Sequence, residues 1–428
     1  MGSIGIRHET KSEWERRVAV TPALAEHLIA TGIDVVVERS DRRIFRNEEY
    51  EAVGAELVDT LPATDIVIGV KEVPSDLFKA GGNYLFFSHV IKGQSYNMPM
   101  LARMLDQGCT LIDYERITNE KGQRLVFFGR HAGLAGMIDA LWALGKKCQA
   151  QGIATPFSDL GMANDYTSLS DALAVVDAVG DRIATEGVPA QLHPLIIGVA
   201  GYGNVGKGVQ SILEHLPTVE IAPEDVAALS ANPDADNKVI YRVTFKEQHL
   251  ARTLDGSEFV LQDYYNHPDR FEGDFEQYLP HLSMLMNCIY WTDAYPRLVA
   301  ISDLPKMTRC RVLGDISCDI RGAVQVTVEA TEPGDPVYHY DADNDSALMG
   351  FEGTGPVIAA VDILPAELPR EASETFTEAL TPYVVALANA DYSAPFEQLD
   401  LPPAMKRAVI VHRGRLTPDY QYLSEYLA

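Results

Sequence analysis

Cysteine is scarce in this chain, and long apolar runs are absent. The five cysteines among 428 residues are scattered, and none shares the C-x-x-C spacing of a zinc or redox site. Neither a disulfide framework nor a metal site is therefore expected, and the thiols are predicted to be reduced. No run approaches the roughly 18 apolar residues of a membrane span, and the N-terminus shows no signal pattern. We expect a cytoplasmic protein that does not bind a membrane.

Positive charge is also in short supply. The chain has 35 Lys and Arg against 61 Asp and Glu, a formal net charge of -26. An acidic surface repels phosphate-rich partners, so nucleic acid and anionic membranes are excluded as ligands. An anionic substrate would have to be bound by local arginines and lysines. A chain of this length with 46% hydrophobic residues can bury two cores, which predicts two domains.

A glycine-rich turn is the central motif. The apolar stretch 195–200 predicts a buried strand, and Gly-Tyr-Gly-Asn-Val-Gly follows at 201–206 before an apolar helical pattern. Gly201 permits a tight turn, Gly203 lets the backbone approach a pyrophosphate, and Gly206 lets the helix pack near its strand. The helix N-terminus adds free N–H groups and partial positive charge. The motif predicts a dinucleotide site, the alternative being an ordinary glycine-bearing turn in an α/β sheet.

Apolar strands alternate with helical segments along the whole chain. This predicts an α/β fold of two Rossmann-like domains with doubly wound, mostly parallel sheets and a cleft between the domains. Residues 1–131, with a return of 366–428, are predicted to form the substrate-binding domain. Residues 132–365 are predicted to form the dinucleotide-binding domain. A small-residue helix at 132–144 is expected to pack closely at the border, and 222–236 is expected to be irregular.

Cationic residues stand where predicted strands of the first domain open into loops. Lys71 follows an apolar strand, His89 follows the next one, and Lys92 lies three residues farther on. Each alone is ordinarily a solvated or hydrogen-bonded residue. Beside a nicotinamide site they suit hydride transfer, because histidine donates protons near pH 7 and a lysine crowded by cations can share that work.

Other side chains could complete such a site. Arg17 and Arg124 can clamp carboxylates, and Glu115 can neutralise the cationic group or simply be a surface carboxylate. Asn287 and Asp315 fall near the ends of two predicted strands of the second domain. Ligands of open α/β sheets lie beyond such strand ends.

Several motifs together resemble one family. They are Arg16–Pro22, Val70–Pro74, Phe86–Gln94, Asp113–Glu115, Phe128–Gly136, Asn287–Trp291, Gly314–Asp319 and Leu364–Ser373. In this order they are similar, nearly end to end, to the lysine-ketoglutarate reductases, or L-lysine-forming saccharopine dehydrogenases. The first two motifs also resemble the related alanine dehydrogenases and transhydrogenases. The stretch 222–281 is more similar to the reductase half of the bifunctional animal and plant enzymes than to the fungal form.

The resemblance implies an activity and a set of site residues. The enzyme would condense the ε-amine of L-lysine with 2-oxoglutarate and reduce the imine to saccharopine, a step of lysine degradation. Lys71 and His89 would be the acid–base pair, with Glu115 moderating their charge. The implied carboxylate ligands are Arg17, Lys92 and Arg124, and the implied coenzyme contacts are Gly201, Gly203, Asn204, Val205, Gly206, Asn287, Asp315 and Asp319.

The coenzyme and the assembly are less constrained. NAD enzymes place an acid at the end of the second nucleotide strand. That strand is expected at 218–222, with Glu220 inside it and Glu224 and Asp225 just beyond. Resemblance to the animal and plant reductases favours NADP, with NAD as the alternative, and a homo-oligomer is expected. The rival hypotheses are an alanine- or opine-dehydrogenase-type enzyme acting on another amine, and a non-catalytic nucleotide sensor.

Overall fold

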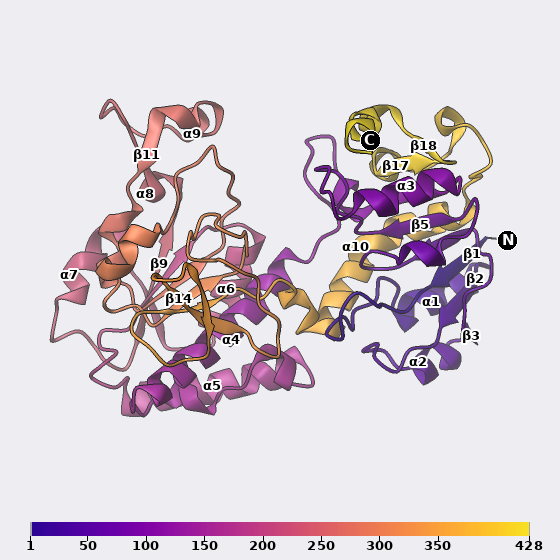
Figure 1. Ribbon diagram of the computed structural model, residues 1–428. Coiled ribbons are helices and arrows are strands. Elements are labelled where there is room, and N and C mark those ends of the chain that lie inside the picture. The colour runs from indigo at the N-terminus through magenta and orange to yellow at the C-terminus, as the bar shows by residue number, and fades with distance from the viewer. Residues whose placement is uncertain (1, 428) are drawn as a thin grey trace. The chain divides into compact units, whose positions relative to one another are not determined.

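The computed structural model describes residues 2–427, and the chain divides into two units. Unit 1 contains Met1–Phe128 and Pro369–Ala428, and unit 2 contains Gly129–Leu368 (Figure 1). The chain crosses between the units at points three residues from the expected borders at 131 and 366. Each unit has one eight-stranded, mostly parallel sheet, which confirms the predicted α/β class.

The sheet of unit 1 has the strand order β18-β17-β6-β5-β4-β1-β2-β3. Strands β1 to β6 are parallel, and β17 and β18 add an antiparallel edge. The strands are β1 (Ser3–Ile6), β2 (Asp34–Glu38), β3 (Glu56–Val58), β4 (Ile66–Ile68), β5 (Asn83–Phe86), β6 (Thr110–Asp113), β17 (Val409–His412) and β18 (Arg415–Leu416). The helices are α1 (Pro22–Ala30), α2 (Asn47–Ala52), α3 (Met98–Asp106), α10 (Pro369–Asn389) and α11 (Pro403–Arg407).

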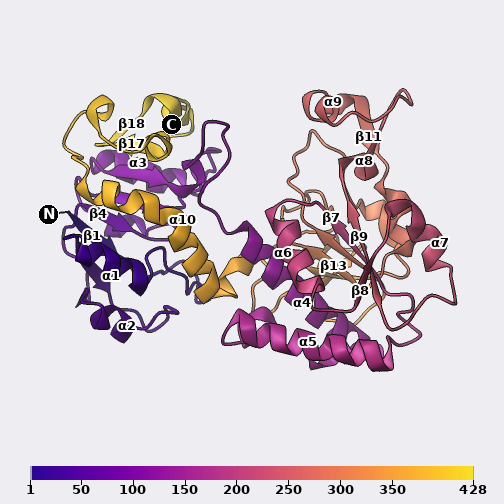
Figure 2. The same cartoon turned by 180° about the vertical axis from the view of Figure 1, so that it is seen from behind.

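The C-terminal segment returns to unit 1 because α10 carries an apolar stripe that completes its core. Phe376 and Leu380 of this stripe join a cluster with Ile4 and Leu85 from the strands. Figure 2 shows α10 and α1 lying against the same sheet. Side chains of α3 belong to a separate cluster with Phe86, the neighbour of Leu85 in β5. Successive residues of this strand therefore enter two different cores, as expected for a parallel strand buried on both faces.

The sheet of unit 2 has the order β15-β14-β16-β13-β12-β7-β9-β8. Its neighbouring strands pair in parallel except at the edge, where β14 is antiparallel to both β15 and β16. The strands are β7 (Ile196–Ala200), β8 (Thr218–Glu220), β9 (Ile240–Phe245), β12 (Met284–Asn287), β13 (Val312–Asp315), β14 (Val337–Asp341), β15 (Ser346–Met349) and β16 (Val357–Ala359), with a separate ribbon of β10 (Ala251–Thr253) and β11 (Phe271–Gly273). The helices are α4 (Gly129–Ala150), α5 (Leu169–Glu186), α6 (Asn204–Leu213), α7 (Val226–Ser230), α8 (Glu247–Leu250) and α9 (Leu261–Asn266).

Two expectations for unit 2 need correction. The second nucleotide strand, expected at 218–222, is the shorter β8 at 218–220, and it lies at the outer edge of the sheet. The strand that pairs with β7 is β9, with Ala200 opposite Phe245. The stretch 222–236, expected to be irregular, contains the short helix α7. The three-residue β8 is mostly exposed, whereas the six-residue β9 is mostly buried and takes the place beside β7. The order of these two strands cannot be read from their order in the sequence.

The small-residue helix expected at 132–144 is α4, and it packs against α6 within unit 2. A Cβ at Gly133 would stand 2.0 Å from the carbonyl oxygen of Val205, and one at Gly208 would stand 2.2 Å from that of Arg130. The two helices therefore touch backbone to backbone, and the contact fixes α6 where it leaves the glycine turn. Among residues 2–427, no helix has the combination of length and apolar character that crossing a membrane requires.

Candidate active and coenzyme sites

Five charged residues of unit 1 lie just beyond the carboxyl ends of four neighbouring parallel strands. Strands β6, β5, β4 and β1 are consecutive in the sheet. Glu115 follows β6, His89 follows β5, Lys71 and Glu72 follow β4, and Glu9 follows β1. We call these five residues the charged edge. Open α/β sheets bind ligands at such an edge, and all three predicted catalytic residues, Lys71, His89 and Glu115, lie there.

Glu72 is the carboxylate that contacts His89. Its Oε1 lies 2.8 Å from Nδ1 of His89 and 3.5 Å from Nζ of Lys11. Burial alone would raise the pKa of Glu72, but the hydrogen bond and charge of His89, helped by Lys11, lower it to about 2. A carboxylate on Nδ1 holds the proton there, so Nε2 is the nitrogen that can exchange a proton with a ligand. Sequence reasoning passed over Glu72, although it stands directly beside Lys71.

Replacing Glu72 with glutamine should cost stability in a pH-dependent way. The pKa of Glu72 is depressed from its ordinary 4.5 to about 2 in the folded state, so its contribution is complete above pH 4.5 and is lost as the pH falls towards 2. We expect Glu72→Gln to lower the free energy of unfolding by about 1–2 kcal/mol at neutral pH, and by less below about pH 4. Denaturant unfolding across this range measures the effect, with the exposed Glu120→Gln as control. A pH-independent difference would contradict the pairing.

Glu115 is paired with a different cation from the one expected. Its Oε1 accepts a hydrogen bond of 2.7 Å from Nη2 of Arg124. Its backbone N–H donates to Oδ1 of the buried Asp113, whose Oδ2 accepts from the N–H of Ser88. Burial, with the nearby charge of Glu115, raises the pKa of Asp113 to about 6. The structure thus ties Glu115 and Arg124 together, while their action on substrate stays a prediction.

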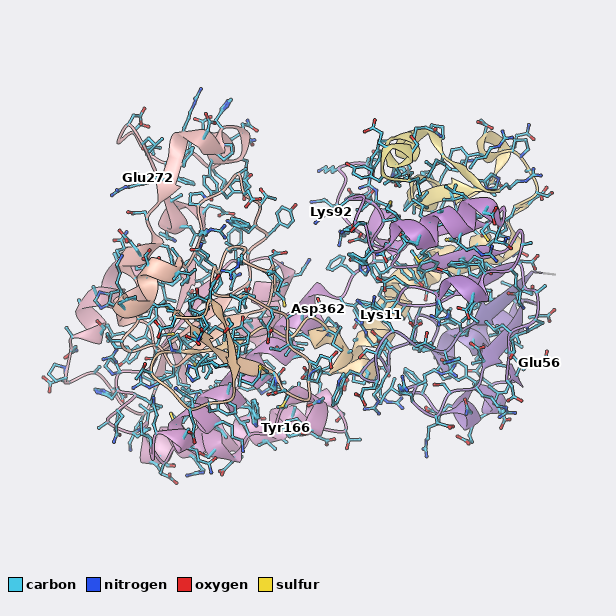
Figure 3. All side chains as sticks on the ribbon, in the orientation of Figure 1. Lys11, Glu56, Lys92, Tyr166, Glu272 and Asp362 are labelled. Atoms are coloured by element: carbon cyan, nitrogen blue, oxygen red, sulfur yellow. The ribbon has the colours of Figure 1, made fainter. Side chains whose placement is uncertain are left out.

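Arg17 is buried and already has an internal partner, which sequence reasoning missed. Its Nε and Nη2 bond the two carboxylate oxygens of Glu15 at 2.8 and 2.5 Å, and its guanidinium lies 4.2 Å from the ring centroid of Phe128. Burial would raise the pKa of Glu15, but the charges of Arg17 and of Lys71 lower it. Lys92, the other expected carboxylate ligand, is exposed in the loop after β5 (Figure 3).

The glycine turn of unit 2 is tight on one side and open on the other, as a pyrophosphate-binding turn is expected to be. Gly201 has a φ of +105°, and a Cβ there would meet the carbonyl oxygen of Cys288 at 2.9 Å. A Cβ at Gly206 would meet the carbonyl oxygen of Gly201 at 2.4 Å, so the helix starts tightly against the turn. Around Gly203 nothing lies within 4 Å of such a Cβ, which leaves the turn open on that side. Asn204 begins α6, whose first N–H groups are donors for phosphate oxygens.

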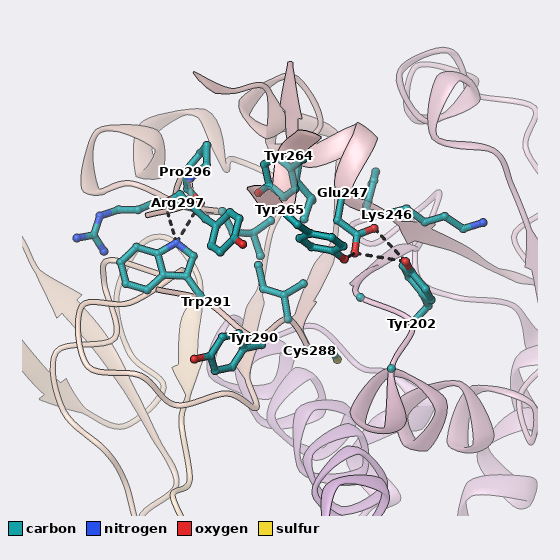
Figure 4. A pocket seen from close by; sticks show the side chains of 17 residues that line it. Tyr202, Lys246, Glu247, Tyr264, Tyr265, Cys288, Tyr290, Trp291, Pro296 and Arg297 are labelled. Atoms are coloured by element: carbon teal, nitrogen blue, oxygen red, sulfur yellow. Dashed lines mark hydrogen bonds between the residues drawn. The ribbon is translucent and has the colours of Figure 1, made fainter. Parts of the chain in front are cut away.

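A cavity of about 380 Å³ adjoins this turn (Figure 4). It lies beyond the carboxyl ends of β7, β9 and β12, where the ligand of an open α/β sheet belongs. Seven aromatic side chains line it, which suits a flat heterocyclic base. The lining residues include Tyr202, Glu247, Tyr264, Tyr265, Tyr290 and Trp291.

Asn287 and Asp315 are the last residues of β12 and β13, and they are bonded to each other. Nδ2 of Asn287 donates to Oδ1 of Asp315 at 2.8 Å, and both residues are buried. Burial raises the pKa of Asp315 to about 6, although hydrogen bonds from Thr327 and Asn287 oppose the rise. Asp319 lies in the loop after β13 and is exposed. In the described part of the chain, no group of three His, Cys, Asp or Glu side chains could hold a metal ion.

Comparisons with solved structures identify the fold. An L-alanine dehydrogenase, 20% identical, matches over all of both chains with a TM-score of 0.66. The transhydrogenase from Sinorhizobium meliloti, 16% identical, matches 97% of this chain and all of its own with a TM-score of 0.56. Family models described as the alanine dehydrogenase/PNT N-terminal and C-terminal domains match residues 5–135 and 272–419. The chain thus has the fold and both family domains of the alanine dehydrogenase and transhydrogenase class.

Proteins similar in sequence identify the family within this class. The saccharopine dehydrogenase [NAD(+), L-lysine-forming] of Neurospora crassa is 30% identical over 89% of this chain and 90% of its own. The alpha-aminoadipic semialdehyde synthases of Arabidopsis thaliana and Mus musculus are 36% and 33% identical over 99% of this chain. This chain spans 41% and 47% of their lengths. The chain belongs to the saccharopine dehydrogenase family, which confirms the resemblance found in the sequence.

Proposed function

We propose that this chain joins L-lysine to 2-oxoglutarate and reduces the resulting imine to saccharopine with a nicotinamide coenzyme. The observation that supports this most is the charged edge of unit 1. It combines a histidine with a fixed tautomer and a lysine at the ends of adjacent strands, next to arginines suited to carboxylates. Both substrates are carboxylic acids, and the reaction moves several protons, so a site for it needs both kinds of group.

The proposed roles follow from whether each side chain can carry a proton or bind a carboxylate. The ε-ammonium of the substrate lysine must lose a proton before it attacks the keto carbon, and the resulting hydroxyl must gain one to leave as water. Lys71 and His89 are proposed to carry these protons, with Glu72 fixing the His89 ring. Arg17, Lys92 and Arg124 are proposed to bind substrate carboxylates, and Glu115 to moderate the local charge through Arg124.

The coenzyme is proposed to bind unit 2, where it supplies the hydride. Backbone groups of 201–206 would hold its pyrophosphate, and the aromatic cavity would hold its adenosine half. Asn287, Asp315 and Asp319 would lie near its ribose or nicotinamide. The resemblance to animal and plant reductases favours NADP(H), whereas the fungal relatives are named for NAD(+).

A substrate panel tests the proposal. With L-lysine, 2-oxoglutarate and either NADH or NADPH, the purified chain should oxidise the coenzyme and form a product with the mass of saccharopine. Ornithine is one methylene shorter and should react at least about tenfold more slowly. Equal turnover with ammonia in place of lysine would instead favour an alanine-dehydrogenase-type reaction. Coenzyme binding with no turnover on any amine would favour the non-catalytic alternative.

A further inference from the structure

The residue that meets the adenosine ribose is set by strand order. In the Rossmann nucleotide-binding sheet, with strand order 3-2-1-4-5-6, the second strand lies beside the first, and an acidic residue beyond the glycine motif bonds the ribose 2′-OH. Here the neighbour of β7 is β9, and the N–H of Gly201 donates to the carbonyl oxygen of Phe245 at 3.0 Å. Lys246 and Glu247 follow directly, level with the glycine turn. Glu220, at the end of β8, belongs to the outer strand.

Glu247 is held in a fixed position by two tyrosines, and we call the three side chains the Tyr-Glu-Tyr clamp. Its Oε1 accepts a 2.6 Å hydrogen bond from the hydroxyl of Tyr265, and its Oε2 accepts one of 3.1 Å from that of Tyr202. Burial and the charge of Glu247 raise the pKa of both tyrosines, so the hydroxyls stay protonated and remain donors. A carboxylate has about four acceptor positions, so two donors leave room for the hydroxyls of a ribose.

Two cations, Lys246 and Arg297, line this cavity, and each lies near an aromatic ring. Lys246 is exposed, and its Nζ lies 5.8 Å from the ring centroid of Tyr202. Figure 4 shows its chain extending away from the Glu247 carboxylate. The guanidinium of Arg297 lies 4.8 Å from the ring centroid of Trp291. A 2′-phosphate would bring a second negative charge to Glu247, and like charges across a binding surface cost affinity.

We infer that the Tyr-Glu-Tyr clamp selects NAD(H) over NADP(H), with Glu247 accepting hydrogen bonds from the adenosine ribose and repelling a 2′-phosphate. This inference rests on the proposed nicotinamide coenzyme. It departs from the NADP(H) preference that the resemblance favours, because Glu247, just beyond the end of β9, carries the same sign of charge as a 2′-phosphate.

Titration of the purified chain with NADH and with NADPH, following nicotinamide fluorescence without lysine or 2-oxoglutarate, tests the inference. NADH should bind at least about tenfold more tightly. Glu247→Ser and Glu247→Gln should weaken NADH binding and strengthen NADPH binding, so that the preference is lost. Glu220→Gln is the matched control, because it removes a strand-end glutamate from the outer strand and should leave both affinities unchanged.

The outcomes separate this inference from the proposed function. Tighter binding of NADPH by the unaltered chain, or a preference that survives Glu247→Ser, would overturn the role of the clamp. NADPH binding lost in Lys246→Ala would also overturn it, by giving the 2′-phosphate to Lys246. Binding of neither nucleotide to the folded chain would remove the proposed function itself.

Discussion

Lys71→Met and His89→Gln should each lower kcat for lysine and 2-oxoglutarate by about 10²–10⁴-fold, the usual contribution of a positioned acid–base group. Methionine keeps the length and apolar stem of Lys71 but cannot carry a proton. Glutamine keeps a hydrogen-bonding group near Glu72 but cannot titrate near pH 7. Initial rates of coenzyme oxidation at saturating substrate measure the effect, and pH profiles should lose one limb in each variant.

The controls use the same substitutions at exposed sites of unit 1. Lys121→Met lies in the turn after Asn119, and His27→Gln lies on the outer side of α1, so both should retain full turnover. Coenzyme binding should survive in all four variants, because the glycine turn and the aromatic cavity belong to unit 2. Unchanged turnover in both Lys71→Met and His89→Gln would remove these residues from the acid–base role.

Much of the charged edge could be predicted because the ends of apolar runs in the sequence mark the ends of buried strands. The apolar segments before Lys71 and His89 are β4 and β5, and parallel strands bring their carboxyl ends together whatever their sequence separation. The glycine turn was predictable for a similar reason, since Gly201 needs a backbone conformation that other residues avoid. Local chemistry and strand polarity were sufficient for both features.

The partners of these residues were not predictable, because they depend on side-chain direction and strand order. Glu72 rather than Glu115 contacts His89, and the carboxylate of Glu15 accepts two hydrogen bonds from the guanidinium of Arg17. Glu220, Glu224 and Asp225 were the acidic residues near the expected second nucleotide strand, and the sequence did not distinguish among them. The pairing of β7 with β9 depends on long-range packing, which leaves no local signal, and this pairing is the basis for proposing Glu247 instead.

A larger side chain at Gly133 should be the most damaging single change to the fold of unit 2. Gly133→Leu places a Cβ 2.0 Å from the carbonyl oxygen of Val205, so α4 and α6 must separate. We expect the free energy of unfolding to fall by about 3–5 kcal/mol, as in severe core clashes. Because α6 starts at the glycine turn, coenzyme affinity should fall as well. Denaturant unfolding and NADH titration measure the two effects.

Gly133→Ala makes the test more discriminating. In an ordinary helix this change stabilises by about 1 kcal/mol, because alanine has the higher helix propensity. Here the added methyl group meets backbone rather than solvent, so the sign should reverse. Gln149→Leu, at an exposed position of the same helix, should leave stability and coenzyme binding nearly unchanged. If Gly133→Ala were more stable than the unaltered protein, the close contact of α4 with α6 would not exist, and the position of the coenzyme turn would need another explanation.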